Sequence, residues 1–310
     1  MSDTLISLRR KISGAGDLQS VVSTMKALAA AGIGQYEQSV IALADYARTV
    51  ELGLRVCVRT GPPMAIMGEQ KQGRDAGTIG AVVFGSDQGL VGQFNEVIAD
   101  YTVKTLAALP GNHKILAVGE RVQARLTDAS LHMLGGFPVP NSVKAITPLV
   151  GQILLESETR HSRGEITELH LFYNSPTSRT VYAPVRQRLL PLDETWQSGL
   201  ASLPWPTKNL PEVIGGATVT LQALIHEYLF ISLFRACAES LASENASRLA
   251  AMQRAEKNID DLLEDLTRHF HQLRQRGIDE ELFDVISGFE ALAKESTTLG
   301  HGVSGPGIKK

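Results

Sequence analysis

The chain has 310 residues, of which 43% are hydrophobic and 20% charged, as in an ordinary folded protein. A formal net charge of −3 argues against nucleic acid as a main partner, and no stretch approaches the ~20 apolar residues of a membrane span. The N-terminal residues show no signal or transit peptide, so we expect a cytoplasmic protein that reaches a membrane only through partners.

A long coiled-coil helix is predicted over residues 1–58, with its regular part from about Leu5 to about Val58. Its apolar residues recur at alternating steps of four and three, which is the heptad spacing of helices that supercoil. The clearest run comprises Tyr36, Val40, Leu43, Ala47, Val50 and Leu54. Gly14 and Gly16 predict a local bend, and the glycine-rich stretch 60–77 predicts a surface connection.

Residues 78–205 alternate between short apolar runs and helical segments, which predicts a small central α/β domain with a largely parallel sheet. Strands are expected at residues 79–84, 114–118, 168–173 and 180–189, and helices at 94–109, at 142–163 and in a short run that ends at Leu126. A short turn-rich segment separates the last two strands, so we expect them to form a hairpin.

A second long coiled-coil helix is predicted over residues 217–292, and residues 293–310 are expected to be a disordered tail. At 1.5 Å per residue the two terminal helices reach roughly 80 and 110 Å. Helices this long cannot bury their apolar stripes against a small domain, so we expect an antiparallel coiled coil beside an α/β domain. The stripe continues to Leu282 and Phe289, which predicts a partner that surrounds the projecting end.

No motif in the sequence points to a catalytic residue, a cofactor or a metal. Residues 85–92 lack the Gly-Lys-Ser/Thr ending of a phosphate-binding loop. His269 and His271 stand two apart on a predicted helix, so they do not share a face as metal ligands would. Cys57 and Cys237 have apolar neighbours and fit no metal or disulfide spacing, which indicates two reduced thiols.

Four stretches, in order over nearly the whole chain, resemble the γ subunits of F-type ATP synthases. Residues 11–31 are similar to the family's K-I…A-M-x-x-V-A-A-A segment, and residues 85–95 to S-D-R-G-L-C-G-x-F-N. Residues 243–252 resemble S-E-x-A-x-R-x-x-A-M, and residues 274–292 resemble R-Q-x-x-I-T-x-E-L…I-V-x-G-A-x-A-L.

Departures from these motifs place the chain in a divergent or alternative branch of the family. Val21, Val22 and Ser23 stand where K-I-T-K is common, Asp279 replaces the usual Thr and Gln88 replaces the usual Arg. Because these basic residues are missing, the contacts that the family's first helix makes with β subunits are not expected to carry over in full to this chain.

The resemblance implies the central rotor shaft of a bacterial ATP synthase, which couples ion flow through the membrane sector to ATP synthesis or hydrolysis. Its implied partners are the alpha and beta subunits of the catalytic ring, the epsilon subunit and the membrane c-ring, at the cytoplasmic face of the cell membrane. It implies no cofactor and no catalytic site in this chain. The implied partner contacts are Met25, Lys26, Ser86, Asp87, Arg248, Arg274, Gln275, Leu282 and Phe289.

Two of these residues have a more specific implied role. Arg274 and Gln275 would hydrogen-bond a moving region of the β subunit as a catch, because the guanidinium fork makes directional, charge-assisted bonds. The family also brings the regions of Met25 and Arg248 together. In an antiparallel pair the residue numbers of two facing positions add to a nearly constant value. Here this sum is expected to be about 273, give or take one helical turn, so Tyr36 is expected beside Cys237.

From the residues alone, two other classes of protein stay open. One is a free-standing coiled-coil scaffold with an α/β head, and the other is a small-molecule enzyme with its site in the central domain. Apolar heptads that continue to the C-terminal end favour the shaft over the enzyme. Co-purification with α and β subunits would separate the shaft from the scaffold.

Overall fold

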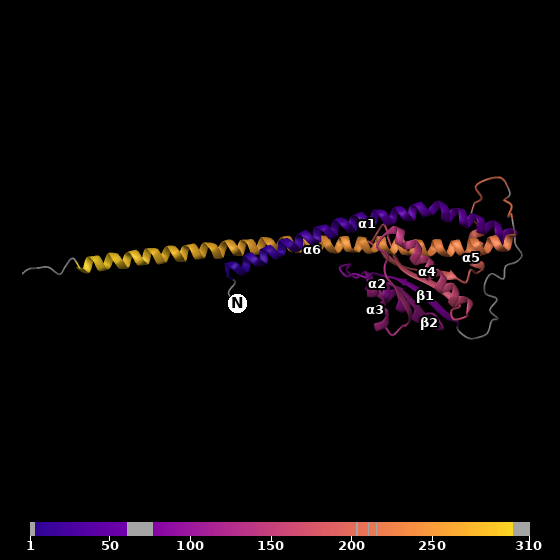
Figure 1. Ribbon diagram of the computed structural model, residues 1–310, viewed down its shortest axis with the longest axis horizontal. Helices are drawn as coiled ribbons and strands as arrows, with labels where there is room; N and C mark the ends of the chain where they lie inside the picture. Colours follow the sequence, from indigo (N-terminus) through magenta and orange to yellow (C-terminus); the bar gives the residue numbers. More distant parts are fainter. Residues whose placement is uncertain (1–3, 61–76, 203, 210, 215, 300–310) are drawn as a thin grey trace, which may run out of the picture. The chain divides into compact units, whose positions relative to one another are not determined.

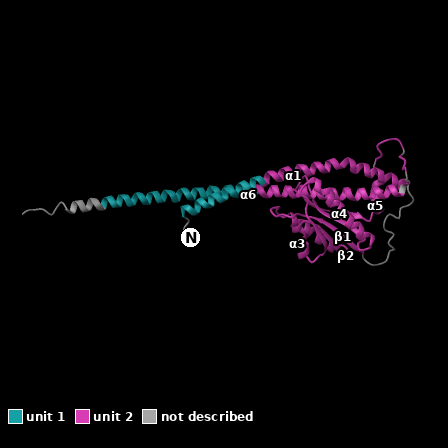
Figure 2. Cartoon of the chain, viewed as in Figure 1, with its two compact units in different colours: residues 1–24, 254–310 teal, residues 25–253 magenta. Residues whose placement is uncertain are grey.

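The computed structural model describes residues 4–60, 77–202, 204–209, 211–214 and 216–299. It divides into two compact units, which we describe separately (Figure 2). Unit 1 comprises Met1–Thr24 and Arg254–Lys310, and unit 2 comprises Met25–Gln253. The two longest helices, α1 (Leu5–Thr60) and α6 (Ala217–Leu299), contribute residues to both units.

The predicted pair of long terminal helices is confirmed, with small differences at the ends. Helix α1 is assigned without a break through Gly14 and Gly16. Helix α6 extends to Leu299, beyond the predicted end at Leu292. The rest of the predicted tail, residues 300–310, and most of the predicted surface connection, residues 61–76, lie outside the described residues.

In unit 2, α1 and α6 lie side by side and run antiparallel (Figure 1). The Tyr46 hydroxyl donates to Glu227 Oε2 at 2.8 Å. Nearer the start of α1, a Cβ added to Gly32 would lie 3.0 Å from Asn245 Oδ1. Partner numbers therefore fall along α6 as they rise along α1, and they match the predicted register to within about one helical turn.

The heptad residues of α1 supply its buried face, as the spacing predicts. Val50 and Leu54 are 3% and 0% exposed, and they share a core with the α6 residues Leu229 and Leu241. Tyr36 and Cys237 belong to the same core. Both cysteines are free and buried.

The central part of unit 2 is a five-stranded sheet in the order β3-β2-β1-β4-β5. The strands are β1 (Thr78–Phe84), β2 (Asn112–Val118), β3 (His132–Phe137), β4 (Glu168–Ser175) and β5 (Ala183–Leu190). Strand β1 pairs in parallel with β2 and β4, and β2 pairs in parallel with β3. Strands β4 and β5 are antiparallel, so the predicted largely parallel sheet with a final hairpin is confirmed.

Helices cover both faces of this sheet. The shorter helices are α2 (Phe94–Ala107), α3 (Glu120–Asp128), α4 (Val143–Ser162) and α5 (Glu194–Ser202). On one face, α2 and α3 bury Ile98 and Val122 against Ile79 and Val83 of β1. On the other face, α4 packs together with the terminal helices.

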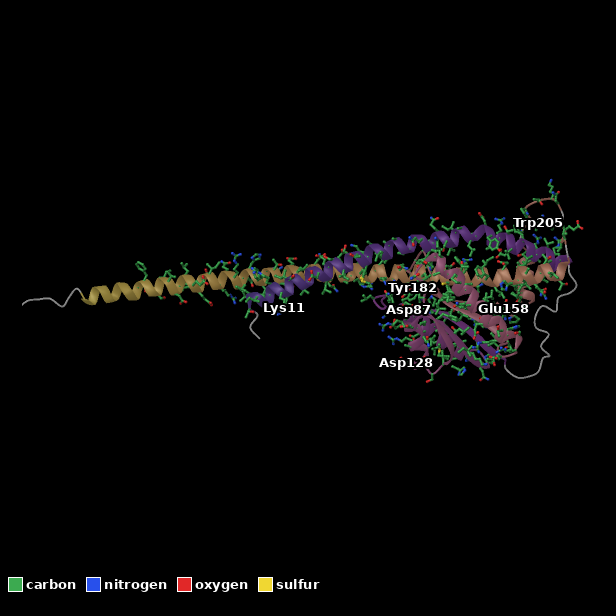
Figure 3. The ribbon with its side chains drawn as sticks, viewed as in Figure 1. Lys11, Asp87, Asp128, Glu158, Tyr182 and Trp205 are labelled. Carbon is green, nitrogen blue, oxygen red and sulfur yellow. The ribbon has the colours of Figure 1, made fainter. Side chains whose placement is uncertain are left out.

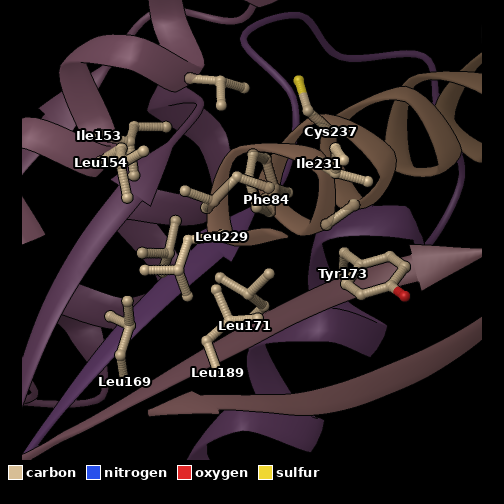
Figure 4. Packing of buried hydrophobic residues seen from close by; sticks show 14 of the residues in the cluster. Phe84, Ile153, Leu154, Leu169, Leu171, Tyr173, Leu189, Leu229, Ile231 and Cys237 are labelled. Carbon is tan, nitrogen blue, oxygen red and sulfur yellow. The ribbon is translucent and has the colours of Figure 1, made fainter. Parts of the chain in front are cut away.

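The second face carries the larger core. Phe84, Leu171 and Leu189 from three strands lie against Leu229 and Ile231 of α6 (Figure 4). Since successive side chains of a strand point to opposite faces, the continuous apolar run of β1 fills both cores. The terminal helices are thus part of the hydrophobic core of the central domain and not only neighbours of it.

In unit 1 the ends of the two long helices also meet. Leu8 is fully buried, and the Arg9 guanidinium lies 5.8 Å from the centre of the Phe270 ring. Gln19 Nε2 donates to Asp260 Oδ1 at 2.5 Å. The residue numbers again rise along α1 as those of their partners fall along α6, so the two helices of unit 1 are antiparallel.

Candidate functional site

The loop between β1 and α2, residues 85–93, is held in place by buried polar side chains. It follows the carboxyl end of a central parallel strand, where α/β sheets commonly place functional groups. Ser86 is fully buried, and its backbone N–H donates to Asn95 Oδ1 at 2.9 Å. Asn95 Nδ2 donates in return to Ser86 Oγ at 2.8 Å, and Ser86 Oγ donates to the Gln88 carbonyl at 2.9 Å. The turn is therefore fixed by its own side chains.

Asp87, which is labelled in Figure 3, bonds this loop to two other segments of unit 2. One carboxylate oxygen accepts from the Glu120 backbone N–H at 2.9 Å and the other from the Val139 backbone N–H at 2.8 Å. Glu120 opens α3, so the negative charge of Asp87 lies at the positive end of a helix dipole. Both oxygens of the predicted contact residue Asp87 are thus engaged within the chain.

A close backbone approach beside this loop requires glycine. Gly119 has φ +114°, and a Cβ at this position would lie 2.8 Å from the Ser86 backbone nitrogen. The Gly119 N–H donates to the Phe137 carbonyl at 2.9 Å. The ends of β2 and β3 are therefore packed directly against the loop.

At the tip of the loop, Leu90 adopts φ +62° and is 62% exposed. A positive φ is uncommon for a residue with a branched apolar side chain. The next residue, Val91, is buried, and its carbonyl accepts from Ser247 Oγ of α6 at 2.5 Å. The loop therefore presents an apolar side chain to solvent while its backbone is attached to α6.

A buried ion pair on α6 faces the same loop. Arg248 Nη2 donates to Glu244 Oε1 at 2.7 Å, and the two side chains are 13% and 7% exposed. Burial raises the pKa of Glu244, Arg248 opposes this shift, and the charge of Asp87 adds to it. Burial, Glu244 and Cys237 together raise the pKa of Tyr36 on α1. These five side chains form one electrostatic group.

Sequence reasoning identified Ser86, Asp87 and Arg248 but missed Asn95, Glu244 and their bonds. The spacing of Glu244 and Arg248, four apart on a predicted helix, was a usable signal for an ion pair. The bond between Ser86 and Asn95 had no such signal, because it depends on the turn that the loop makes.

A second surface of interest is the C-terminal part of α6 in unit 1, which we call the distal α6 surface. Every residue from 278 to 290 is exposed. Its large apolar side chains and their exposed fractions are Ile278 (55%), Leu282 (57%), Phe283 (69%), Val285 (67%), Ile286 (47%) and Phe289 (77%). Arg274 and Gln275 lie just before it and are exposed as well.

The remaining predicted contact residues, Met25 and Lys26, are half-buried on α1 in unit 2. Gly32 faces Asn245, and extending this register along the two helices places Met25 opposite about position 252. Arg248 is therefore within about one helical turn of the residue that faces Met25.

Within the described residues, no group of three or more His, Cys, Asp or Glu side chains has the arrangement of a metal site. His269 and His271 are exposed on α6. Among the helices that the structure describes, none combines the length and the apolar character needed to cross a bilayer.

Comparison with known proteins gives consistent results. A family model described as ATP synthase matches residues 4–292. The ATP synthase gamma chain of Rhizorhabdus wittichii is 28% identical over 301 residues, covering 93% of this chain and 99% of that one. The gamma chain of Desulfitobacterium hafniense is 26% identical over 290 residues, covering 92% and 98%.

Solved structures share the fold. A chain in the OSCP/F1/c-ring structure of the Euglena gracilis mitochondrial ATP synthase superposes with a TM-score of 0.61 at 16% identity, covering 99% of this chain and 98% of that one. A chain in the central stalk/c-ring structure from Tetrahymena thermophila gives a TM-score of 0.53 at 20% identity, covering 76% and 99%.

Proposed function

This chain belongs to the ATP synthase gamma-chain family, and from that premise we propose that it is the central rotor shaft of an F-type ATP synthase. In this role it couples ion flow through the membrane sector to ATP synthesis or hydrolysis in a ring of alpha and beta subunits. Its further partners are the epsilon subunit and the c-ring, which hold it at the cytoplasmic face of the membrane. The helices 1–58 and 217–292 form the shaft, and residues 78–205 form the head.

The distal α6 surface is the observation that carries this proposal. Phe289 and Leu282 are 77% and 57% exposed on a helix segment that is exposed all round. A helix end with so much uncovered apolar area calls for a partner that surrounds it. A sleeve of subunits around a shaft provides that cover, whereas a free-standing scaffold leaves it in water.

The mechanism requires an asymmetric shaft and no chemistry in this chain. A helical pair inside a three-fold ring presents a different face to each beta subunit, and each face favours one conformation of the catalytic site there. Rotation shifts these populations in turn, because a contact changes an equilibrium only when it differs between two states. The catalytic residues belong to the ring in this proposal.

Contacts with the ring are assigned to α1, α6 and the β1–α2 loop. Arg274 and Gln275 form the catch with beta, and both side chains are exposed and available for it. Met25, Lys26 and Arg248 contribute on the paired part of the helices, and Ser86 and Asp87 shape the loop. Leu282 and Phe289 form the bearing surface.

Activity and assembly test the proposal directly. We expect the purified chain to hydrolyse no ATP above background and to support turnover once alpha and beta subunits are added. Robust ATP hydrolysis by the isolated chain that a substitution within it abolishes would contradict the assignment as a shaft. Failure to assemble with alpha and beta would favour the scaffold instead.

The catch is tested by replacing Arg274 and Gln275 together with Ala. Loss of one charge-assisted hydrogen bond corresponds to ~1.5–3 kcal/mol, so we expect turnover of the assembled complex to fall by roughly tenfold or more. Arg276→Ala, an exposed arginine outside the catch, is the matched control and should leave turnover unchanged. Equal rates for the double variant and the control would count against the catch.

A further inference from the structure

A cavity of about 210 Å³ lies in unit 2 beside the β1–α2 loop, and the ring contacts proposed above do not say what fills it. Its walls come from α1, the loop, the segment before α4, and α6. Tyr36, Gln88, Asn141, Glu244 and Arg248 are among its lining residues. The lining is polar, and the volume is enough for one small side-chain group.

The ion pair in the cavity wall leaves one buried donor atom and one buried acceptor atom unused. Arg248 and Glu244 are joined through Nη2 and Oε1 alone. Glu244 Oε2 and Arg248 Nε are buried, and within the described part of the chain neither has a hydrogen-bond partner. Guanidinium and carboxylate groups commonly pair through two parallel bonds, and buried polar atoms in folded proteins are almost always satisfied. These two atoms therefore call for a further group.

The charges around the cavity decide what kind of group fits. Both oxygens of Asp87 already accept backbone N–H bonds. A cation entering the cavity would meet Arg248, and an anion would meet Glu244 and Asp87. A neutral group that offers one N–H and one C=O meets both unused atoms without adding charge. A primary carboxamide has these two functions.

Leu90 indicates that this group comes from another protein chain. It lies two residues after Gln88 of the cavity wall, is 62% exposed and is held at φ +62°. Backbone strain of this kind persists only where the surroundings enforce it. The bonds of Ser86 and Ser247 enforce it here, so the loop presents an apolar side chain next to the polar cavity.

We propose that the cavity receives an Asn or Gln side chain of a neighbouring subunit, whose N–H donates to Glu244 Oε2 and whose C=O accepts from Arg248 Nε. The backbone around that residue packs on Leu90. This inference rests on the proposed function, because a shaft in a complex has neighbouring subunits.

The test uses the chain assembled in its complex, with a photo-crosslinking amino acid at position 90. We expect crosslinks to one neighbouring chain, within a few residues of an Asn or Gln. Gln88→Trp adds bulk at an exposed residue of the cavity wall, and it should lower the crosslink yield by about tenfold or more. Gln88→Ala is the matched control and should keep the yield within about twofold.

The outcomes separate this inference from the proposed function. If the unmodified chain does not assemble with alpha and beta subunits, the proposed function itself fails. If the complex assembles and turns over but position 90 gives no crosslink, this inference alone is wrong. It is also wrong if Gln88→Trp leaves the yield unchanged, if the crosslinked site has no carboxamide nearby, or if a density map of the complex shows only water in the cavity.

Discussion

Replacing Arg248 with Met should destabilise unit 2, because it removes the cation that faces the buried carboxylate of Glu244. The two side chains are only 13% and 7% exposed, so solvent screens their interaction weakly. Removing one member of a buried ion pair lowers the free energy of unfolding by about 3–5 kcal/mol. Met has a similar volume and keeps the packing, so the loss reports the charge.

Protonation of Glu244 limits the size of this loss and makes it depend on pH. The ordinary pKa of a glutamic acid is 4.5. At pH 7 the carboxyl is about 2.5 pH units above that value, and neutralising it at 1.36 kcal/mol per unit requires about 3.4 kcal/mol. In the variant the folded state holds a proton that the unfolded state has lost, so stability falls as pH rises above 4.5. We expect losses of up to about 3.4 kcal/mol at pH 7 and about 1.4 kcal/mol at pH 5.5.

Urea unfolding followed by tryptophan fluorescence measures this effect, since both tryptophans, Trp196 and Trp205, lie in unit 2. The control is the double variant Glu244→Met and Arg248→Met, which leaves no buried charge at the pair. It should recover most of the stability and show little dependence on pH. A loss below about 1 kcal/mol at pH 7, or a loss that is equal at both pH values, would refute the reasoning.

Two further predictions concern a buried histidine of the sheet and a strained glycine next to it. Burial is the main cause that lowers the pKa of His170 below 6.5, so its folded form is neutral and the unfolded state binds the extra proton. The free energy of unfolding should therefore fall, by up to about 1.4 kcal/mol per pH unit, as pH drops below 6.5. His170→Gln should remove this dependence on pH, whereas His132→Gln, at an exposed position, should leave it in place. Urea unfolding at pH 5, 6 and 7 measures the free energy of unfolding of each variant. Gly119→Ala combines a positive φ with contact at 2.8 Å to backbone, so we expect a loss of about 3 kcal/mol or more. Gly164→Ala, at φ +69° with open space around it, should lose only about 1 kcal/mol, and equal losses would contradict the role of the backbone contact.

The helical pair and most of the sheet could be predicted because their apolar periods are strong. Val50 and Leu54 continue a heptad over several turns, and such a pattern fits only a long paired helix. Strand β3 was not predicted, because two of its six residues are Gly135 and Gly136 and glycine weakens a strand pattern. Helix α5 was also missed, since it is short and contains Gly199, a residue of low helix propensity.

The candidate site was predicted only in part, because its bonds join residues far apart in sequence. Asp87 binds backbone groups of Glu120 and Val139, which are 33 and 52 positions away. Ser247 and Val91 are separated by 156 positions. A motif can mark such residues, but the identity of the partner depends on how the elements pack.

The larger core of unit 2 has a consequence for how the protein is made. Val50 and Leu54 near one end of the chain share that core with Leu229 and Leu241 near the other. At 5–20 residues per second a ribosome needs roughly ten to forty seconds to pass from the first pair to the second. During that interval strand β1, which carries Phe84, emerges with one apolar face uncovered. We therefore expect the nascent chain to be prone to aggregation until α6 leaves the exit tunnel, and truncation within α6 should lead to aggregation or proteolysis of the head.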